Sequence, residues 1–115
     1  MSYMLLIVEP VGQRAERTEA EGRGLFESML AFADRLTQRG VLIAAQSLRT
    51  DASRLQVRNG RQAIVDGPFS EAKEMVGGYF LLDCATRDEA VAIAAECPAA
   101  QWATVEVREF GPCFT

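Results

Sequence analysis

The side chains best suited to chemistry gather in one polar stretch near the middle of the chain. In order, the stretch reads Asp66-Gly67-Pro68-Phe69, Ser70-Glu71-Ala72-Lys73-Glu74 and, two residues further on, Gly77-Gly78-Tyr79. A Gly-Pro pair bounds it at one end and a glycine pair at the other, and apolar runs flank it. Rigid scaffolds commonly display functional groups on such loops, so we predict a site here.

Candidate roles follow from the residue types in and near this loop. Asp66 is the candidate catalytic group, because a carboxylate can accept a proton from a small polar ligand. In an alternative interpretation, Asp66 caps the turn by accepting backbone amides ahead of Gly67. The candidate ligand-binding residues are Tyr3, Lys73, Glu74 and Tyr79. The residues expected to shape the loop are Gly67, Pro68, Phe69, Gly77 and Gly78.

The sequence contains no histidine, which restricts the acid–base chemistry open to it. Histidine is the one side chain that titrates near neutral pH without help from its surroundings. Any acid or base must therefore be a tuned carboxylate, lysine, tyrosine or cysteine. A neighbouring carboxylate, Glu71 or Glu74, would make Asp66 a stronger base only if the fold brought the two close together.

Two further patterns carry weaker signals. Ser70 and Lys73 have the S-x-x-K spacing that can activate a serine nucleophile, but the other elements of that chemistry are missing, so a solvated loop is favoured. Positive charge also concentrates around residues 49–61, where an anionic partner or a solvated hairpin face would each account for it. The residues concerned are Arg49, Arg54, Arg58 and Arg61.

Length and composition indicate one globular domain over residues 1–115, with 49% hydrophobic and 24% charged residues. The net charge of −4 opposes binding to nucleic acid. No apolar run is long enough for a membrane span, and the start lacks the features of a signal peptide, so a cytoplasmic protein is expected. Three cysteines without C-x-x-C spacing argue against a disulfide framework or a metal site, and no cofactor is expected.

Periodicity predicts alternating strands and helices. Strands are expected at 3–8, 41–48, 54–58, 61–65, 79–84 and 102–110. Asn59-Gly60 predicts a tight hairpin that places Arg58 opposite Arg61. Apolar residues at helical spacing predict a helix from about residue 25 to Gly40, after a polar, glycine-bearing segment 11–24. The spacing of Thr86 and Glu89 predicts the start of a second helix that ends at Cys97-Pro98.

This order of elements, β-α-β, an inserted β-hairpin, then β-α-β, predicts an α+β protein with a ferredoxin-like antiparallel sheet. Helices can cover only one face of such a sheet, yet segments 3–8 and 79–82 are apolar on both alternating faces. Large apolar side chains left in water cost on the order of 1.5–3 kcal/mol each. We therefore expect a homodimer in which two sheets pack face to face as a dimeric α+β barrel. The alternative is that the inserted hairpin folds over its own sheet.

The same residues carry a resemblance to a known family. Tyr3-Met4-Leu5-Leu6-Ile7, the loop 66–74, the run 77–82 and Val105-Glu106-Val107-Arg108 together resemble the YCII-related family, in its DGPF-domain branch. The resemblance covers nearly the whole chain and implies the dimeric α+β barrel fold, with a cleft between sheet and helices near the loop. Better-studied YCII-like proteins use a histidine and aspartate pair for proposed proton transfer. This sequence has Asp66 at the loop but lacks the histidine.

Two functions of different classes are consistent with these features. The first is a small-molecule-binding protein or cofactor-independent enzyme, of proton-transfer or isomerisation type, with its cleft near the Asp-Gly-Pro-Phe loop. The second is a noncatalytic accessory module that binds a protein partner. Members that resemble this chain often occur beside alternative sigma factors, which would place such a module in bacterial regulation.

Overall fold

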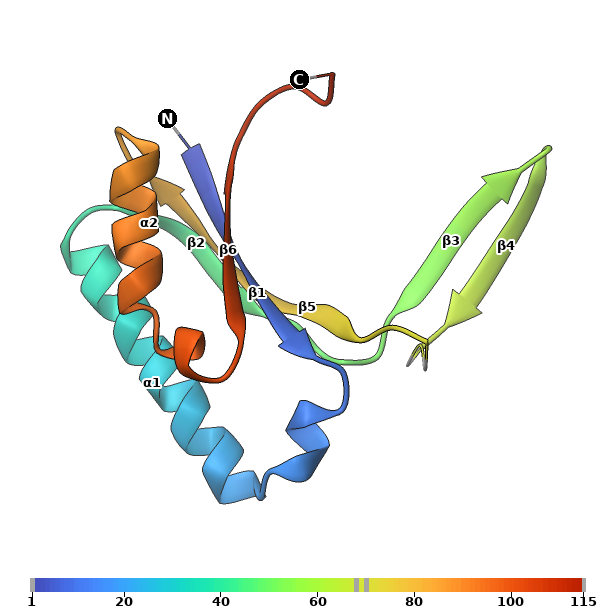
Figure 1. Cartoon of the computed structure of the whole chain (residues 1–115), viewed down its shortest axis with the longest axis horizontal. Helices are drawn as coiled ribbons and strands as arrows, with labels where there is room; N and C mark the ends of the chain where they lie inside the picture. The colour runs from blue at the N-terminus through green and yellow to red at the C-terminus, as the bar shows by residue number, and fades with distance from the viewer. Residues whose placement is uncertain (1, 68, 70, 115) are drawn as a thin grey trace.

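The computed structural model describes residues 2–67, 69 and 71–114, so Pro68 and Ser70 of the predicted loop lie outside the described residues. The elements in chain order are β1 (Ser2–Pro10), a 3-10 helix η1 (Gln13–Glu16), α1 (Glu19–Gln38), β2 (Leu42–Ser47), β3 (Ser53–Arg58), β4 (Arg61–Asp66), β5 (Glu74–Asp83), α2 (Arg87–Glu96), a second 3-10 helix η2 (Pro98–Gln101) and β6 (Thr104–Glu109). Figure 1 shows their arrangement.

The main sheet is antiparallel, with the strand order β2-β5-β1-β6. The first and third strands of the predicted β-α-β-β-α-β pattern, β1 and β5, therefore lie side by side in the centre. Helices α1 and α2 lie together on one side of this sheet (Figure 1). The prediction of an α+β, ferredoxin-like fold is confirmed.

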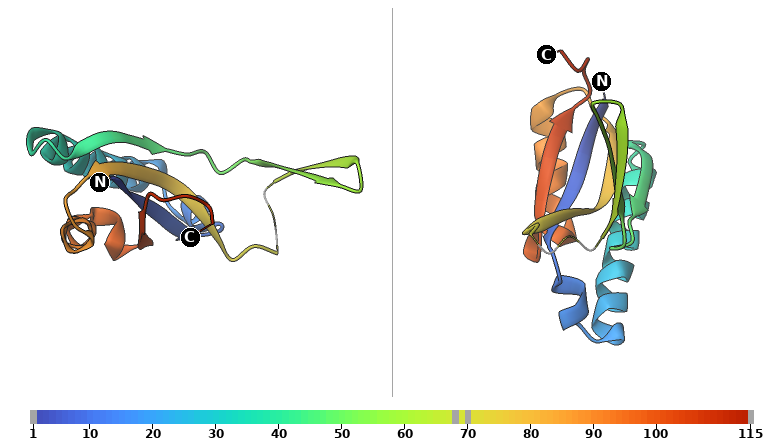
Figure 2. Two further views of the ribbon diagram at one scale, coloured as in Figure 1. Left: turned by 90° about the horizontal axis from the view of Figure 1, so that it is seen from above. Right: turned by 90° about the vertical axis from the view of Figure 1, so that its right-hand side faces the viewer.

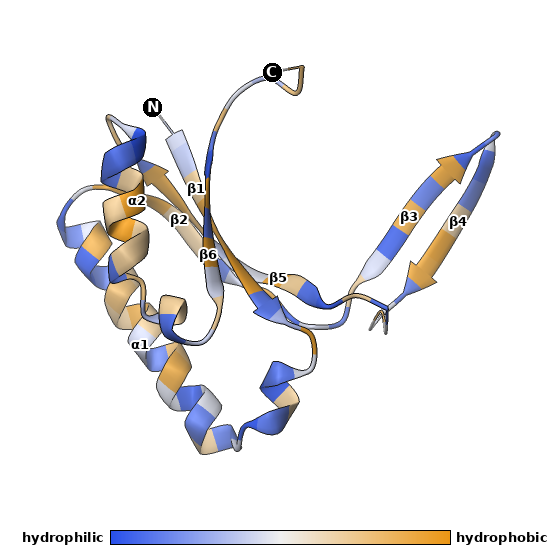
Figure 3. Ribbon diagram, in the orientation of Figure 1, coloured by the Kyte–Doolittle hydropathy of each residue, from blue (hydrophilic) through white to orange (hydrophobic). Residues whose placement is uncertain are grey.

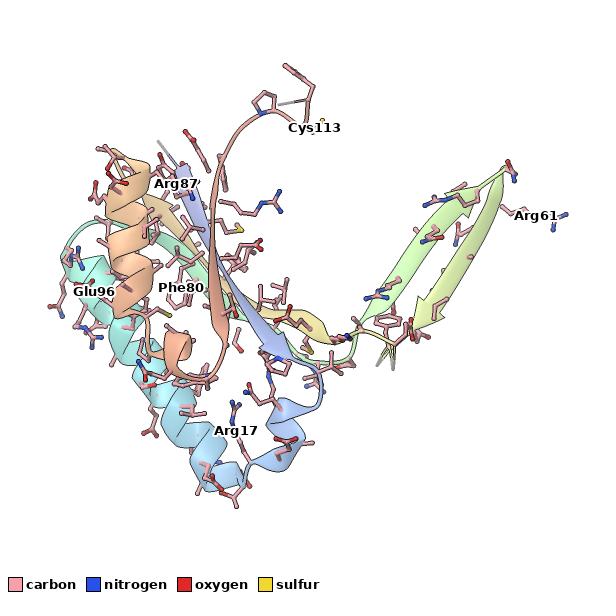
Figure 4. The ribbon with its side chains drawn as sticks, in the orientation of Figure 1. Arg17, Arg61, Phe80, Arg87, Glu96 and Cys113 are labelled. Carbon is pink, nitrogen blue, oxygen red and sulfur yellow. The ribbon has the colours of Figure 1, made fainter. Side chains whose placement is uncertain are left out.

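The core lies between the helices and one face of the sheet. In β1 every second residue is buried, beginning with Tyr3, Leu5 and Ile7, because side chains of a strand alternate between its two faces. Phe80 on β5 packs edge-on against Phe32 of α1, with ring centroids 5.2 Å apart, and Figure 4 shows Phe80 between sheet and helices. The predicted inward stripe of α2 is buried as expected, and consists of Ala90, Ile93, Ala94 and Cys97.

Helix α1 begins six residues earlier than predicted. Thr18 caps it with a capping box: the Thr18 hydroxyl accepts from the Glu21 amide at 3.1 Å, and the Glu21 carboxylate accepts from the Thr18 amide at 3.2 Å. Gly22 and Gly24 disfavour a helix by about 1 kcal/mol each relative to alanine, and they led to the prediction of an irregular segment. The cap satisfies amides that the helix end leaves unpaired, and packing of Phe32 and Leu36 in the core stabilises the same helix.

Strand β5 also begins earlier than predicted, at Glu74 rather than Tyr79. The glycine pair Gly77-Gly78 therefore lies inside the strand and does not close the loop. The pairing with β1 shifts register between Ile7 and Val8, opposite these glycines. Glycine within a strand commonly marks such an irregularity or a close approach of another group.

Strands β3 and β4 form a separate hairpin, called the arm below, which projects away from the body of the protein on the side opposite the helices (Figures 1 and 2). Asn59 and Gly60 have φ angles of 52° and 73°, as a tight hairpin turn requires, and Arg58 lies opposite Arg61 as predicted. Because the arm extends outward, it does not fold over its own sheet. The face of the main sheet opposite the helices, called the open face below, carries Met4, Leu6, Val8 and Leu81 half-buried.

Neither helix α1 nor α2 of the described chain is long and apolar enough to cross a membrane. The thiols of the chain differ in exposure: Cys84 and Cys97 are buried in the core, whereas Cys113 is exposed near the chain end, away from the body in Figure 4. Burial raises the pKa of the Cys84 and Cys97 thiols, so both stay protonated at neutral pH.

We expect a thiol reagent such as Ellman's reagent to modify one cysteine per native chain rapidly at pH 7.5, and all three after unfolding in guanidinium chloride. The thiolate is the reactive form, and both buried thiols are protonated and shielded. Substitution of Cys113→Ser should abolish the rapid phase. A rapid phase that persists in this variant would show that the helix side of the sheet opens to solvent.

Candidate functional site

Two hollows flank the ends of β1 and β5. One of them, the helix cleft, has a volume of about 780 Å³ and lies between the N-terminal half of α1 and the sheet. The other, the loop cleft, has about 950 Å³ and lies between the base of the arm and the ends of β1 and β5. Residues of the helix cleft used below are Glu9, Arg14, Arg17, Phe26, Leu30 and Trp102.

A partly buried ion pair lines both clefts. Glu9, at the end of β1, is 6% exposed and is the buried charged residue of the described chain. Arg14 on η1 donates to both of its oxygens, from Nε at 2.9 Å and from Nη2 at 2.8 Å. Arg14 also donates to the carbonyls of Leu48 at 2.7 Å and Gly77 at 3.1 Å. This pair therefore ties η1 to the ends of β1, β2 and β5.

The glycine pair of β5 makes room for that arrangement. A Cβ on Gly77 would overlap Oε1 of Glu9, and one on Gly78 would lie 2.9 Å from the carbonyl oxygen of Gln46. Neither position has a positive φ angle, so the requirement is one of space rather than of backbone conformation. The ion pair thus explains Gly77, and the close approach of the β2 backbone explains Gly78.

The helix cleft has an apolar wall on α1. Phe26 and Leu30 line it and remain 49% and 53% exposed, because the N-terminal half of α1 extends beyond the sheet (Figure 1). Trp102 contributes from the segment after η2, and its carbonyl accepts from Gln13 Nε2 at 2.8 Å. The cleft therefore combines a hydrophobic side with a charged floor, as small-molecule sites commonly do.

The structure does not bring the four predicted ligand-binding residues together. Tyr79 borders the helix cleft, Glu74 lines the loop cleft, and Lys73 is exposed, with its carbonyl accepting from the Val11 amide at 3.0 Å. Tyr3 is buried on the helix face of the sheet, 3% exposed, and it lines neither cleft. Burial, with a smaller effect of the Glu109 charge, raises the pKa of its phenol.

Asp66 is the last residue of β4 and is exposed at the base of the arm. Its Oδ1 accepts a hydrogen bond from the Ser53 hydroxyl on the paired strand, and the following amide, of Gly67, donates to the Ala52 carbonyl at 2.6 Å. Phe69 lines the loop cleft, with the Arg54 guanidinium 3.7 Å from its ring centre. Phe69, Ala72 and Glu74 of the predicted loop thus line the loop cleft, whereas Asp66 lines neither hollow.

Sequence reasoning missed Glu9, Arg14 and Arg17. One signal for Glu9 was present, because the alternation that turns Tyr3, Leu5 and Ile7 inward also turns Glu9 inward. A carboxylate at a buried strand position requires a partner. Nothing local identified Arg14 as that partner, since η1 lies in the segment predicted to be irregular.

These features define an α+β protein of ferredoxin-like fold with a cleft between α1 and the sheet. The chain matches the YCII-related domain over residues 1–112, and it belongs to that family. An uncharacterized protein of Rhizobium meliloti is 29% identical over 96 residues, which cover 82% of this chain and 77% of the relative.

A solved structure of similar fold is that of 5-chloro-2-hydroxyhydroquinone dehydrochlorinase (TftG) from Burkholderia phenoliruptrix AC1100, in complex with 2,5-dihydroxybenzoquinone. The two share a TM-score of 0.55 at 15% sequence identity, over 96% of this chain and 94% of that one. At this identity the similarity concerns the fold.

We expect Gly77→Ala to lower the free energy of unfolding by about 1–3 kcal/mol, because the added methyl group displaces the Glu9 carboxylate from Arg14. Gly24→Ala is the matched control: it has open space around its Cβ within α1 and should raise stability by about 1 kcal/mol. Urea denaturation followed by circular dichroism measures both. Equal effects of the two substitutions would contradict the role assigned to Gly77.

Proposed function

We propose that this protein binds a small polar organic molecule in the helix cleft and acts on it as a cofactor-independent enzyme of proton-transfer type. The observation that carries the proposal is the position of the Glu9–Arg14 pair at the floor of a cleft with an apolar wall. The volume of about 780 Å³ lies within the range of about 300–1,000 Å³ typical of ligand pockets. The complex of TftG with a small cyclic ligand supports a small molecule as the ligand class.

Glu9 is the proposed proton acceptor. Arg14 occupies one lone pair of each carboxylate oxygen, and a carboxylate has further lone pairs for a ligand. The pair also holds the carboxylate in one orientation, as a general base requires. Tyr79 and Glu74, named from sequence, border the two clefts on either side of this pair and belong to the proposed binding region.

Filling the helix cleft should abolish ligand binding. Gly22 lines the cleft from α1 with open space at its Cβ, so Gly22→Trp places an indole in the cleft without disturbing the core. Gly24→Trp is the control, because two residues along a helix turn the side chain about 200° away. In a thermal-shift screen of metabolites, with 2,5-dihydroxybenzoquinone as the first probe, hits should stabilise wild type and Gly24→Trp but not Gly22→Trp.

For any hit, Glu9→Gln separates binding from proton transfer, because glutamine keeps the shape of the side chain and loses the base. The readout is exchange of acidic ligand C–H protons for deuterium in heavy water, followed by NMR. Exchange catalysed by wild type should fall at least tenfold in Glu9→Gln while binding remains. A hit that stabilises Gly22→Trp as strongly as wild type would rule out the helix cleft as its site.

We propose in addition that the protein is a homodimer formed through the open faces of two sheets. Support comes from Met4, Leu6, Val8 and Leu81 on that face, and from the arm, which extends instead of covering them. The arm itself presents Leu55, Val57 and Ile64 on one side, 60%, 56% and 59% exposed. In a dimer with one twofold axis, the open face and the apolar side of the arm would each be covered by the second copy.

Analytical ultracentrifugation at low micromolar concentration should return twice the chain mass for wild type. Leu6→Arg should give monomers, because it buries an unpaired charge at the centre of the proposed interface. Val91→Arg, on the exposed side of α2, is the matched control and should remain dimeric. A wild-type chain that sediments as a monomer would disprove the dimer, and a dimeric Leu6→Arg variant would move the interface elsewhere.

A further inference from the structure

One charge in the helix cleft has no partner within the described residues. Glu9 is paired with Arg14, and Glu19 is paired with Arg23 at 2.6 Å, so these four charges balance. The Arg17 guanidinium, in contrast, makes no hydrogen bond or ion pair with any residue that the structure describes. Hydrogen bonds with Thr18, and to a smaller extent the Arg17 charge, lower the pKa of Glu21, but this carboxylate does not line the cleft and makes no hydrogen bond or ion pair with the Arg17 guanidinium. The cleft therefore has an excess of one positive charge.

Arg17 is also half-buried and lines the cleft. Its side chain lies between η1 and the N-terminal half of α1 (Figure 4). Removing a charge from water without a partner is unfavourable, so partly buried cations are usually paired. The planar guanidinium presents donors that match a carboxylate, phosphate or sulfonate with two parallel hydrogen bonds. The position is thus suited to an anionic group of a ligand.

The rest of the cleft restricts what such a ligand can be. Phe26 and Leu30 form an apolar wall that is about half exposed to water. Covering this wall with an apolar part of a ligand is favourable, so we expect the ligand to have an apolar body. The carboxylates of Glu9 and Glu19 also line the cleft and repel additional negative charge. A molecule with several anionic groups, such as a nucleotide, fits these charges less well than a molecule with one.

We propose that the ligand of the helix cleft is a small organic monoanion, whose acidic group pairs with Arg17 and whose apolar body lies against Phe26 and Leu30. This inference rests on the helix cleft being the binding site, as proposed above. It assigns Arg17 as the residue that selects the charge of the ligand, a role distinct from the proton transfer assigned to Glu9.

The test compares acids with their uncharged amides of the same size, by isothermal titration calorimetry. Suitable probes are benzoate with benzamide, phenylacetate with phenylacetamide, and hexanoate with hexanamide. Wild type should bind at least one acid tenfold or more tightly than its amide, and added salt should weaken only the acid. Arg17→Gln should remove that preference, and Arg17→Lys should retain part of it.

Arg61→Gln is the matched control, because it changes the net charge equally at the tip of the arm, far from the cleft (Figure 4). It should keep the preference of wild type. If an amide binds as tightly as its acid, and Gly22→Trp abolishes both, the helix cleft is a binding site but the charge selection by Arg17 is wrong. If no probe binds, or if binding survives Gly22→Trp, the proposed site and this inference both fail.

Discussion

The ion pair between Glu9 and Arg14 is the interaction on which the end of the sheet depends. A carboxylate at an inward position of a strand is tolerated only with a partner, and loss of one member of such a pair commonly costs about 3–5 kcal/mol. Arg14 on η1 donates to the carboxylate, and the same guanidinium also donates to the backbone carbonyls of Leu48 and Gly77. The absence of a side chain at Gly77 follows from this contact, and the pair lines both clefts.

The second constraint is the unequal covering of the sheet. Helices α1 and α2 bury one face, while the apolar side chains of the open face are only half-buried within the described chain. Figure 3 shows hydrophobic residues along β1 and β5, the two central strands. The arm cannot serve as a lid, because it is joined to the sheet at its base and points outward (Figure 2). The arm has three arginines and one aspartate, so it is basic although the whole chain has a net charge of −4.

Most of the fold could be predicted from the sequence, because its elements have strong local signals. Alternation in β1, the Asn59-Gly60 turn and the apolar stripe of α2 each predicted an element that the structure has. The two errors have a common cause. Glycine was taken as a sign of irregular backbone at Gly22 and Gly24 and again at Gly77 and Gly78, but tertiary and capping interactions that lie outside the glycines themselves decided the structure.

The site was less predictable, because its residues are brought together by the fold. Attention to the Asp-Gly-Pro-Phe loop followed its unusual composition, yet Asp66 pairs with Ser53 on the arm. Glu9, Arg14 and Arg17 lie within nine positions of one another, but only the reversal of the chain through η1 turns them toward α1. The composition of the sequence drew attention to the loop, whereas the lack of a partner for Arg17 could be recognised only from the positions of the surrounding side chains.

The glycines of α1 have a consequence for motion. Gly22 and Gly24 lie in the first two turns, the part of the helix that extends past the sheet and receives little support from the core, and each weakens it by about 1 kcal/mol. The buried Phe32 and Leu36 anchor the other half of the same helix. The N-terminal turns of α1, which form one wall of the helix cleft, are therefore expected to open locally at a lower free energy than the half of the helix that is anchored in the core.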